Sequence, residues 1–80
     1  MHVSDMRIAE KEIPVGRYRH YKGNEYEVLM LAYHSETEEI MVVYRALYGD
    51  HSVWTRPSSM WFENVQHNGE IVKRFTYLGA

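Results

Sequence analysis

The stretch that decides the fold runs from Tyr44 to Pro57 and reads YRALYGDHSVWTRP. Both halves hold the aromatic and β-branched residues typical of strands, and Gly49-Asp50 between them is a turn signal. The stretch therefore places two tyrosines, a tryptophan and two arginines on neighbouring strands. Such a set suits recognition, because Arg stacks on aromatic rings and binds anions, but it is equally typical of an aromatic core with Arg stems at its edge.

The strand that enters this stretch is predicted to span Ile40–Tyr48. Alternation places two sets of side chains on opposite faces. One face carries Val42, Tyr44, Ala46 and Tyr48, and the other carries Met41, Val43, Arg45 and Leu47. The next strand is predicted at Val53–Arg56, and Pro57 ends it.

Toward the N-terminus, Gly16–His34 is predicted to form a hairpin with strands at Arg17–Lys22 and Glu25–His34. A two-residue turn at Gly23-Asn24 would pair Lys22 with Glu25, Tyr21 with Tyr26 and His20 with Glu27. The apolar run at residues 29–33 predicts a long strand covered on both faces. A polar loop at residues 34–39 follows it.

Toward the C-terminus, Met60–Tyr77 is predicted to form a hairpin around Asn68-Gly69, the strongest turn signal in the chain. This register pairs Val65 with Val72 and Glu63 with Arg74. It places Met60, Phe62, Phe75 and Tyr77 toward the core and Trp61 on the other face.

These segments predict one all-β domain of five or six antiparallel strands over residues 15–80. Residues 1–14 are predicted to be a frayed tail or a single helical turn, because no clear period is present and Pro14 would stop a helix. A sheet this small leaves two open edges, so closure into a barrel is favoured. Cysteine is absent, so packing of the aromatic residues, 14% of the chain, must supply the stability.

The charge and hydropathy of the chain exclude several classes of protein. The formal net charge of -2 argues against a general nucleic-acid binder, although Arg17, Arg19 and Lys22 form a short basic group. No apolar run reaches membrane-spanning length and no signal-peptide pattern is present. We expect a soluble cytoplasmic protein that does not bind a membrane.

The ordered motifs of residues 16–77 resemble a bacterial family known as domain of unknown function 1653. The motifs are GRYRHYKG at residues 16–23, YEV at 26–28, Ala32 with HSET at 34–37, VYRALY at 43–48, and Trp54 with Arg56, Pro57 and Met60. The resemblance implies an SH3-like small barrel. It implies no particular activity.

Two groups of residues are candidate binding sites. The first is an aromatic–arginine groove for a small anionic or planar ligand, or for an acidic peptide. It comprises Tyr44, Arg45, Tyr48, Trp54 and Arg56, with Tyr18 and His20. The alternative is a single-stranded nucleic-acid surface made of Arg17, Arg19, Lys22, Arg56 and Trp61.

Catalytic and metal sites are weaker hypotheses. The histidines at positions 2, 20, 34, 51 and 67 show no metal-binding spacing, and the sequence predicts neither a metal nor a cofactor. A hydrolase-like site using His20 or His34 with Glu36, or Ser35 as a nucleophile, has no motif to support it. We therefore predict a non-enzymatic binding module, monomeric or weakly dimeric, whose partner is a small ligand, a protein or a peptide.

Overall fold

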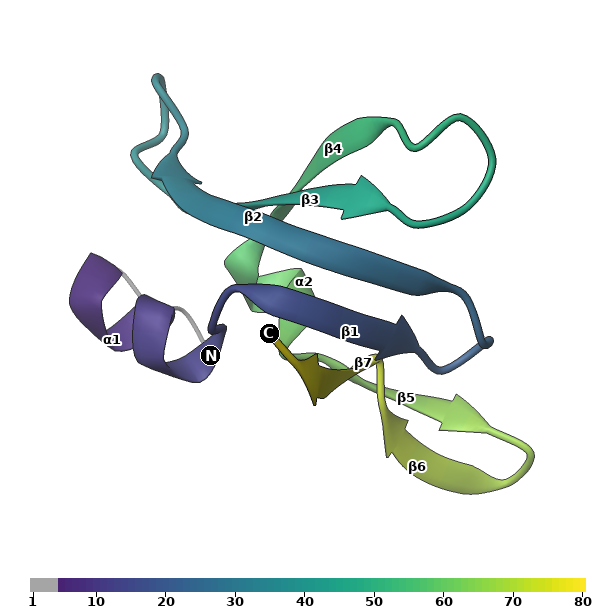
Figure 1. Cartoon of the computed structure of the whole chain (residues 1–80). Helices are drawn as coiled ribbons and strands as arrows, with labels where there is room; N and C mark the ends of the chain where they lie inside the picture. Colours follow the sequence, from purple (N-terminus) through teal and green to yellow (C-terminus); the bar gives the residue numbers. More distant parts are fainter. Residues whose placement is uncertain (1–4) are drawn as a thin grey trace.

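The computed structural model describes residues 5–80, which form two short helices and seven strands (Figure 1). In chain order these are α1 (Met6–Glu12), β1 (Gly16–His20), β2 (Glu25–Tyr33), β3 (Ile40–Ala46), β4 (Val53–Pro57), α2 (Ser58–Trp61), β5 (Asn64–His67), β6 (Glu70–Lys73) and β7 (Phe75–Gly79). No helix among these residues is long and apolar enough to cross a membrane.

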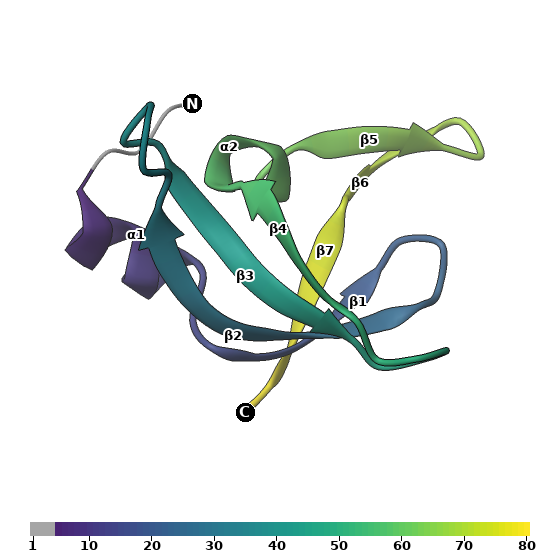
Figure 2. The same cartoon turned by 90° about the horizontal axis from the view of Figure 1, so that it is seen from above.

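Five strands form one antiparallel sheet in the order β4-β3-β2-β1-β7, and β5 and β6 form a separate hairpin. The sheet curls around the core, while β4 and β7 remain its two edges (Figure 2). The prediction of a small all-β domain is therefore confirmed. The expected closure is not, because no ladder of hydrogen bonds joins β4 to β7 in the described part of the chain.

Curvature of the sheet comes from irregularities in its central strands. The β2–β3 register shifts between Val28 and Met30, and the β1–β7 register shifts between Arg17 and Tyr18. An extra residue in one strand bends it and increases its twist. The long β2 strand was predicted correctly, but cover on both faces was not, since Met30 and Tyr33 are exposed.

The β1–β2 hairpin differs from its predicted register by three residues. Arg19 lies opposite Glu25 and Arg17 opposite Glu27, where Lys22 and His20 were expected. The connection is longer than two residues, because the His20 N–H donates to the Asn24 carbonyl and closes a three-residue loop. Gly23, at φ +108°, supplies the positive φ that such a loop needs.

The β5–β6 hairpin has the predicted register near its turn, with Val65 opposite Val72. The prediction was wrong beyond the Glu63–Arg74 pair, because the two segments of the predicted hairpin separate there. Residues 58–61 form α2, while Phe75 begins β7 and pairs with β1 instead. Because β7 leaves the hairpin, it pairs with β1 at the edge of the main sheet. Trp61 is then buried in the core rather than turned away from it.

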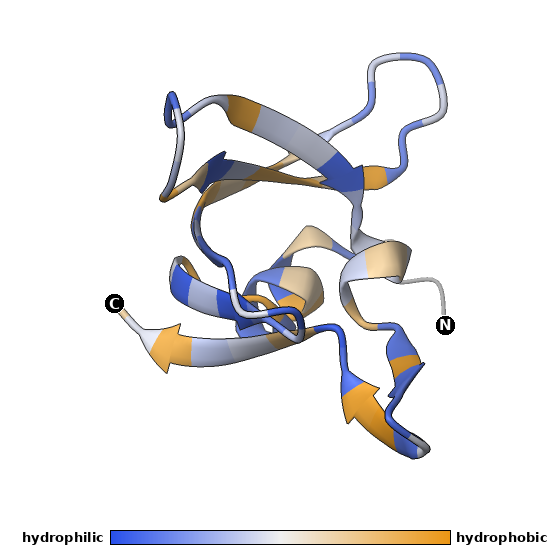
Figure 3. Ribbon diagram, turned by 90° about the vertical axis from the view of Figure 1, so that its right-hand side faces the viewer, coloured by the Kyte–Doolittle hydropathy of each residue, from blue (hydrophilic) through white to orange (hydrophobic). Residues whose placement is uncertain are grey.

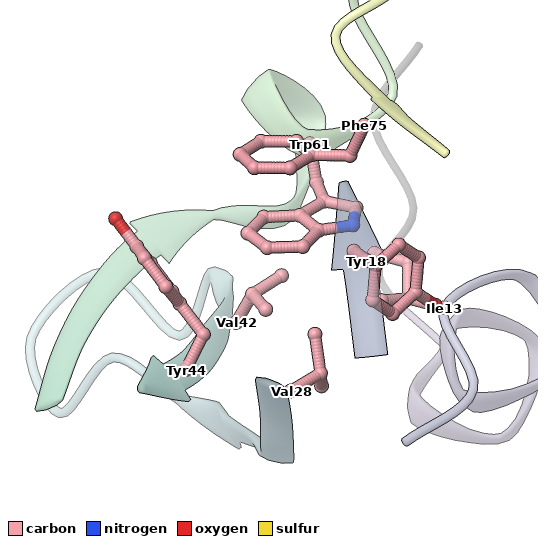
Figure 4. Packing of buried hydrophobic residues seen from close by; sticks show 7 residues of the cluster. All are labelled: Ile13, Tyr18, Val28, Val42, Tyr44, Trp61 and Phe75. Carbon is pink, nitrogen blue, oxygen red and sulfur yellow. The ribbon is translucent and has the colours of Figure 1, made fainter. Parts of the chain in front are cut away.

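Seven residues form the main core: Ile13, Tyr18, Val28, Val42, Tyr44, Trp61 and Phe75 (Figure 4). Trp61 lies at its centre. Its ring stacks on Phe75 with centroids 3.7 Å apart, and it also packs against Tyr18 and Tyr44 at 5.4 and 5.2 Å. Along the strands, residues of opposite hydropathy are interspersed, whereas the connecting loops are mostly hydrophilic (Figure 3).

The prediction of a frayed tail or single turn was wrong for the described residues before Pro14. Asp5 caps α1 by accepting from the Arg7 N–H at 2.9 Å. Ala9 and Ile13, on one face of this segment, are fully buried, and Ala9 packs with Ile40 in a second small cluster. A single alanine carries too little hydropathy to reveal such a face in the sequence.

Candidate functional site

The register of β4 decides which residues of the Tyr44–Pro57 stretch share a face. Trp54 lies opposite Tyr44, and Arg56 lies opposite Val42. Side chains of paired residues in an antiparallel sheet project from the same face. Trp54 and Arg56 therefore lie on the concave face, beside the buried side chains of β3, where β4 forms the open edge.

Arg45 lies on the opposite, outer face of the sheet. It alternates with the buried residues of β3, and its guanidinium lies 3.8 Å from the Glu27 carboxylate on β2. The structure thus separates the two arginines of the stretch. Only Arg56 accompanies the aromatic residues of the concave face.

We call this open region the aromatic–arginine mouth; it comprises His20, Tyr26, Tyr44, Tyr48, Trp54, Arg56 and Phe75. Tyr26 lies at its centre, with ring centroids 5.5 Å from Tyr44, 5.6 Å from Tyr48 and 5.9 Å from Phe75. The Tyr26 and Tyr48 hydroxyls share a hydrogen bond of 2.9 Å. Burial, together with this hydrogen bond, raises the pKa of Tyr26 to about 12, so its phenol is neutral at physiological pH.

Arg56 is the cation of the mouth that is available to a ligand. Its guanidinium carbon lies 5.7 Å from the centroid of Phe75, a cation–π distance. Within residues 5–80 no carboxylate lies within 4.0 Å of it. Trp54, two residues earlier on the same face of β4, is 57% exposed, and Tyr48, which contacts Tyr26, is 46% exposed. The mouth therefore offers accessible rings next to an unneutralised planar cation.

His20 borders the same region. Its ring lies 5.1 Å from Phe75, and its Nδ1 accepts from the Lys22 N–H at 3.2 Å. Burial lowers the pKa of His20 below its ordinary value, and the nearby cations Arg74, Arg56 and Lys22 lower it further. Of these, Arg74 is paired with Glu63 at 3.1 Å. Arg56 and Lys22 form no ion pair among residues 5–80.

The structure brings five of the seven predicted ligand-binding residues to one region: His20, Tyr44, Tyr48, Trp54 and Arg56. Arg45 lies on the outer face, and Tyr18 lies on the far side of Trp61 with its hydroxyl donating to the Pro14 carbonyl at 2.7 Å. Sequence reasoning missed Tyr26 and Phe75, because the wrong hairpin registers paired them elsewhere. The correct Gly23 loop would have placed Tyr26 opposite Tyr18.

The predicted nucleic-acid residues do not share one surface. Arg17 and Arg19 lie on the outer face of β1 and are 3.9 and 3.3 Å from Glu25. Arg56 lies on the concave face. Trp61 was expected outside the core, which was wrong, since it is only 4% exposed.

The predicted histidine and serine sites remain scattered. His20 and His34 lie at opposite ends of β2, and Nδ1 of His34 accepts from the Glu36 and Thr37 N–H groups at 3.1 and 3.3 Å. These bonds tie the loop to itself. Among residues 5–80 no cluster of three or more His, Asp or Glu side chains could hold a metal ion, and His2 lies outside the described residues.

The fold and the mouth define a small, open, all-β domain with a group of aromatic side chains and one arginine at its edge. The sequence also matches the family described as "Protein of unknown function (DUF1653)" over residues 16–77. The chain belongs to this family, as its motifs indicated. It is similar to the crystal structure of a DUF1653 protein from Bordetella bronchiseptica, with 39% sequence identity and a TM-score of 0.79 over 86% of this chain and 91% of that one. No curated protein matches the chain.

Proposed function

We propose that this protein is a binding module whose aromatic–arginine mouth takes a small, planar, anionic ligand. The observation that supports this most strongly is the position of Arg56, unpaired among residues 5–80 and held over Phe75 beside the exposed Trp54. A flat ligand would stack on the rings, and its anionic group would accept hydrogen bonds from the guanidinium.

The expected affinity is modest. Stacking of a base on an aromatic side chain contributes about 1–3 kcal/mol, and a hydrogen bond to a charged group contributes about 1.5–3 kcal/mol. The rigid-body entropy of association and the open geometry offset part of this gain. We therefore expect dissociation constants in the high micromolar to millimolar range for a simple planar anion.

The proposal concerns binding rather than catalysis. The mouth presents aromatic rings and one arginine, and the Nδ1 of its imidazole accepts a hydrogen bond from a backbone N–H. An acidic peptide would present the same kind of anionic group to Arg56. We further propose that the protein acts in the bacterial cytoplasm, as a monomer or a weak homodimer.

The test is a titration of adenosine 5′-monophosphate, adenosine and inorganic phosphate, monitored by Trp fluorescence with inner-filter correction. We expect the nucleotide to bind at least fivefold more tightly than either fragment. Arg56→Gln should weaken nucleotide binding at least fivefold and leave adenosine unaffected. Arg45→Gln is the matched control, since it removes the same charge from the outer face and should change neither affinity.

Equal affinities in the Arg56→Gln and Arg45→Gln proteins would overturn the proposal. A parallel titration with a short single-stranded RNA tests the nucleic-acid alternative. Strongly salt-dependent RNA binding that is lost in an Arg17→Gln, Arg19→Gln double variant but kept in Arg56→Gln would favour that alternative instead.

A further inference from the structure

A recess lies across Trp61 from the mouth. Figure 4 shows Tyr44 and Tyr18 on opposite sides of the indole, and this recess lies on the Tyr18 side. Its volume is about 300 Å³. Five aromatic side chains line it: Tyr18, Trp61, Phe62, Phe75 and Tyr77. We refer to it as the Tyr18–Tyr77 pocket.

The walls of this pocket are held in place by hydrogen bonds to one short segment. The Tyr18 hydroxyl donates to the Pro14 carbonyl at 2.7 Å, and the Tyr77 hydroxyl donates to the Val15 carbonyl at 3.1 Å. The two rings lie 5.0 Å apart. Because both hydroxyls are already engaged, the rings are fixed before a ligand arrives, which lowers the entropic cost of binding.

The pocket also carries two opposite charges that are not used within the fold. Glu12 from the end of α1 and Lys73 from the end of β6 both line it, and both are exposed. In the part of the chain that the structure describes, neither forms an ion pair, with the other or with a third residue. A ligand carrying both an ammonium and a carboxylate group would complement this pair.

Trp61 adds an unsatisfied donor at the wall of the pocket. Its buried indole N–H has no hydrogen-bond acceptor among residues 5–80, and Figure 4 places the nitrogen on the side of the ring toward Tyr18. Buried donors without a partner are uncommon in proteins. Its proton resonance should respond to any aromatic ligand that enters beside it.

We propose that the Tyr18–Tyr77 pocket binds a small aromatic zwitterion, the chemical class of the free aromatic amino acids. The volume is at the lower end for ligand sites, which suits one ring with short substituents. The aromatic walls take the ring, Lys73 takes the carboxylate and Glu12 takes the ammonium group. This inference does not rest on the function proposed for the mouth, because the two regions have only Phe75 in common.

The experiment uses ¹H–¹⁵N correlation spectra of the Trp54→Phe protein, in which Trp61 is the remaining tryptophan of the two in the chain. The ligands are L-phenylalanine, phenylacetate and phenethylamine, which carry both charges, only the anion and only the cation. We expect a saturable shift of the Trp61 indole resonance with phenylalanine. The dissociation constants for the two singly charged compounds should be at least fivefold higher.

Two surface variants test the assigned charges without disturbing the core. Lys73→Gln and Glu12→Gln should each weaken phenylalanine binding at least fivefold, whereas Lys11→Gln and Glu70→Gln, which remove the same charges outside the pocket, should not. Equal binding of all three ligands, no effect of the two pocket variants, or no shift of the Trp61 resonance would overturn the inference.

Discussion

Replacement of each of the two tryptophans by alanine should lower the free energy of unfolding by very different amounts, because one side chain is buried and the other is exposed. Trp61 is 4% exposed and stacked on Phe75 at 3.7 Å, whereas Trp54 is 57% exposed on the edge strand. A buried Trp covers about 200 Å² of mostly apolar surface, equivalent to about 5 kcal/mol at ~25 cal/mol per Å². This is an upper value, because the unfolded chain already buries part of that surface.

The expected cost of Trp61→Ala is therefore about 3–5 kcal/mol, in line with large-to-small core substitutions. Trp54→Ala should cost about 1–2 kcal/mol, since more than half of its side chain faces solvent. A domain of 80 residues has a total stability of about 4–12 kcal/mol. Trp61→Ala thus leaves the protein marginal or unfolded at room temperature.

Urea denaturation followed by far-ultraviolet circular dichroism measures the difference, because tryptophan fluorescence changes with both substitutions. With a slope of about 1 kcal/mol per M urea, the midpoint should fall by about 3 M or more for Trp61→Ala and by about 1–2 M for Trp54→Ala. Trp61→Phe and Trp54→Phe preserve the comparison if the alanine variant does not fold. Equal losses within each pair, or a larger loss at Trp54, would refute the assigned core.

Three further outcomes follow from the structure. The pKa of His20 is lower in the folded protein than in the unfolded chain, so the unfolded chain binds the proton more readily and stability should fall as pH drops through about 6.5 toward the folded pKa. Urea midpoints measured across this pH range should lose that component in His20→Gln, and an unchanged pH profile in the variant would contradict the assignment. Tyr26→Phe and Tyr48→Phe should each cost about 0.5 kcal/mol, because each removes one of the two hydroxyls and breaks the same hydrogen bond. The two costs should therefore be non-additive in a double-mutant cycle, and full additivity would count against that bond. Gly16→Ala should cost well over ~1 kcal/mol in thermal melts, because Gly16 lies at φ +133° and a Cβ there would lie 2.7 Å from the Gly79 carbonyl oxygen. Gly49→Asn should be tolerated, because Gly49 lies at φ +62° and a Cβ there would have no neighbour within 4 Å. Similar losses at both positions would be inconsistent with this packing.

The sequence predicted those parts of the fold in which a local pattern decides the structure. Alternation along β3 and the Asn68-Gly69 turn each depend on neighbouring residues, and both were confirmed. The β1–β2 register was wrong, because Gly23 closes a three-residue loop and a two-residue turn was assumed. The strand around Phe75 was also misassigned, because its partner β1 lies more than fifty residues away in the chain.

The candidate mouth could be predicted only in part for the same reason. Tyr44, Trp54 and Arg56 follow from alternation on two adjacent strands and a short loop. Phe75 arrives from β7, and the cation–π contact with Arg56 depends on how far the sheet curls. The burial of Trp61 results from a single helical turn after Pro57, which no periodicity in a four-residue segment can reveal.

Mapping of the bound ligand on the protein tests the proposed mouth most directly. In ¹H–¹⁵N spectra of the wild-type protein titrated with adenosine 5′-monophosphate, we expect saturable shifts of the Trp54 indole N–H and the Arg56 Nε–H, while the outer-face resonances of Arg17 and Arg19 stay in place. Shifts confined to Arg17 and Arg19, or no saturable shift at Trp54 and Arg56, would contradict the account.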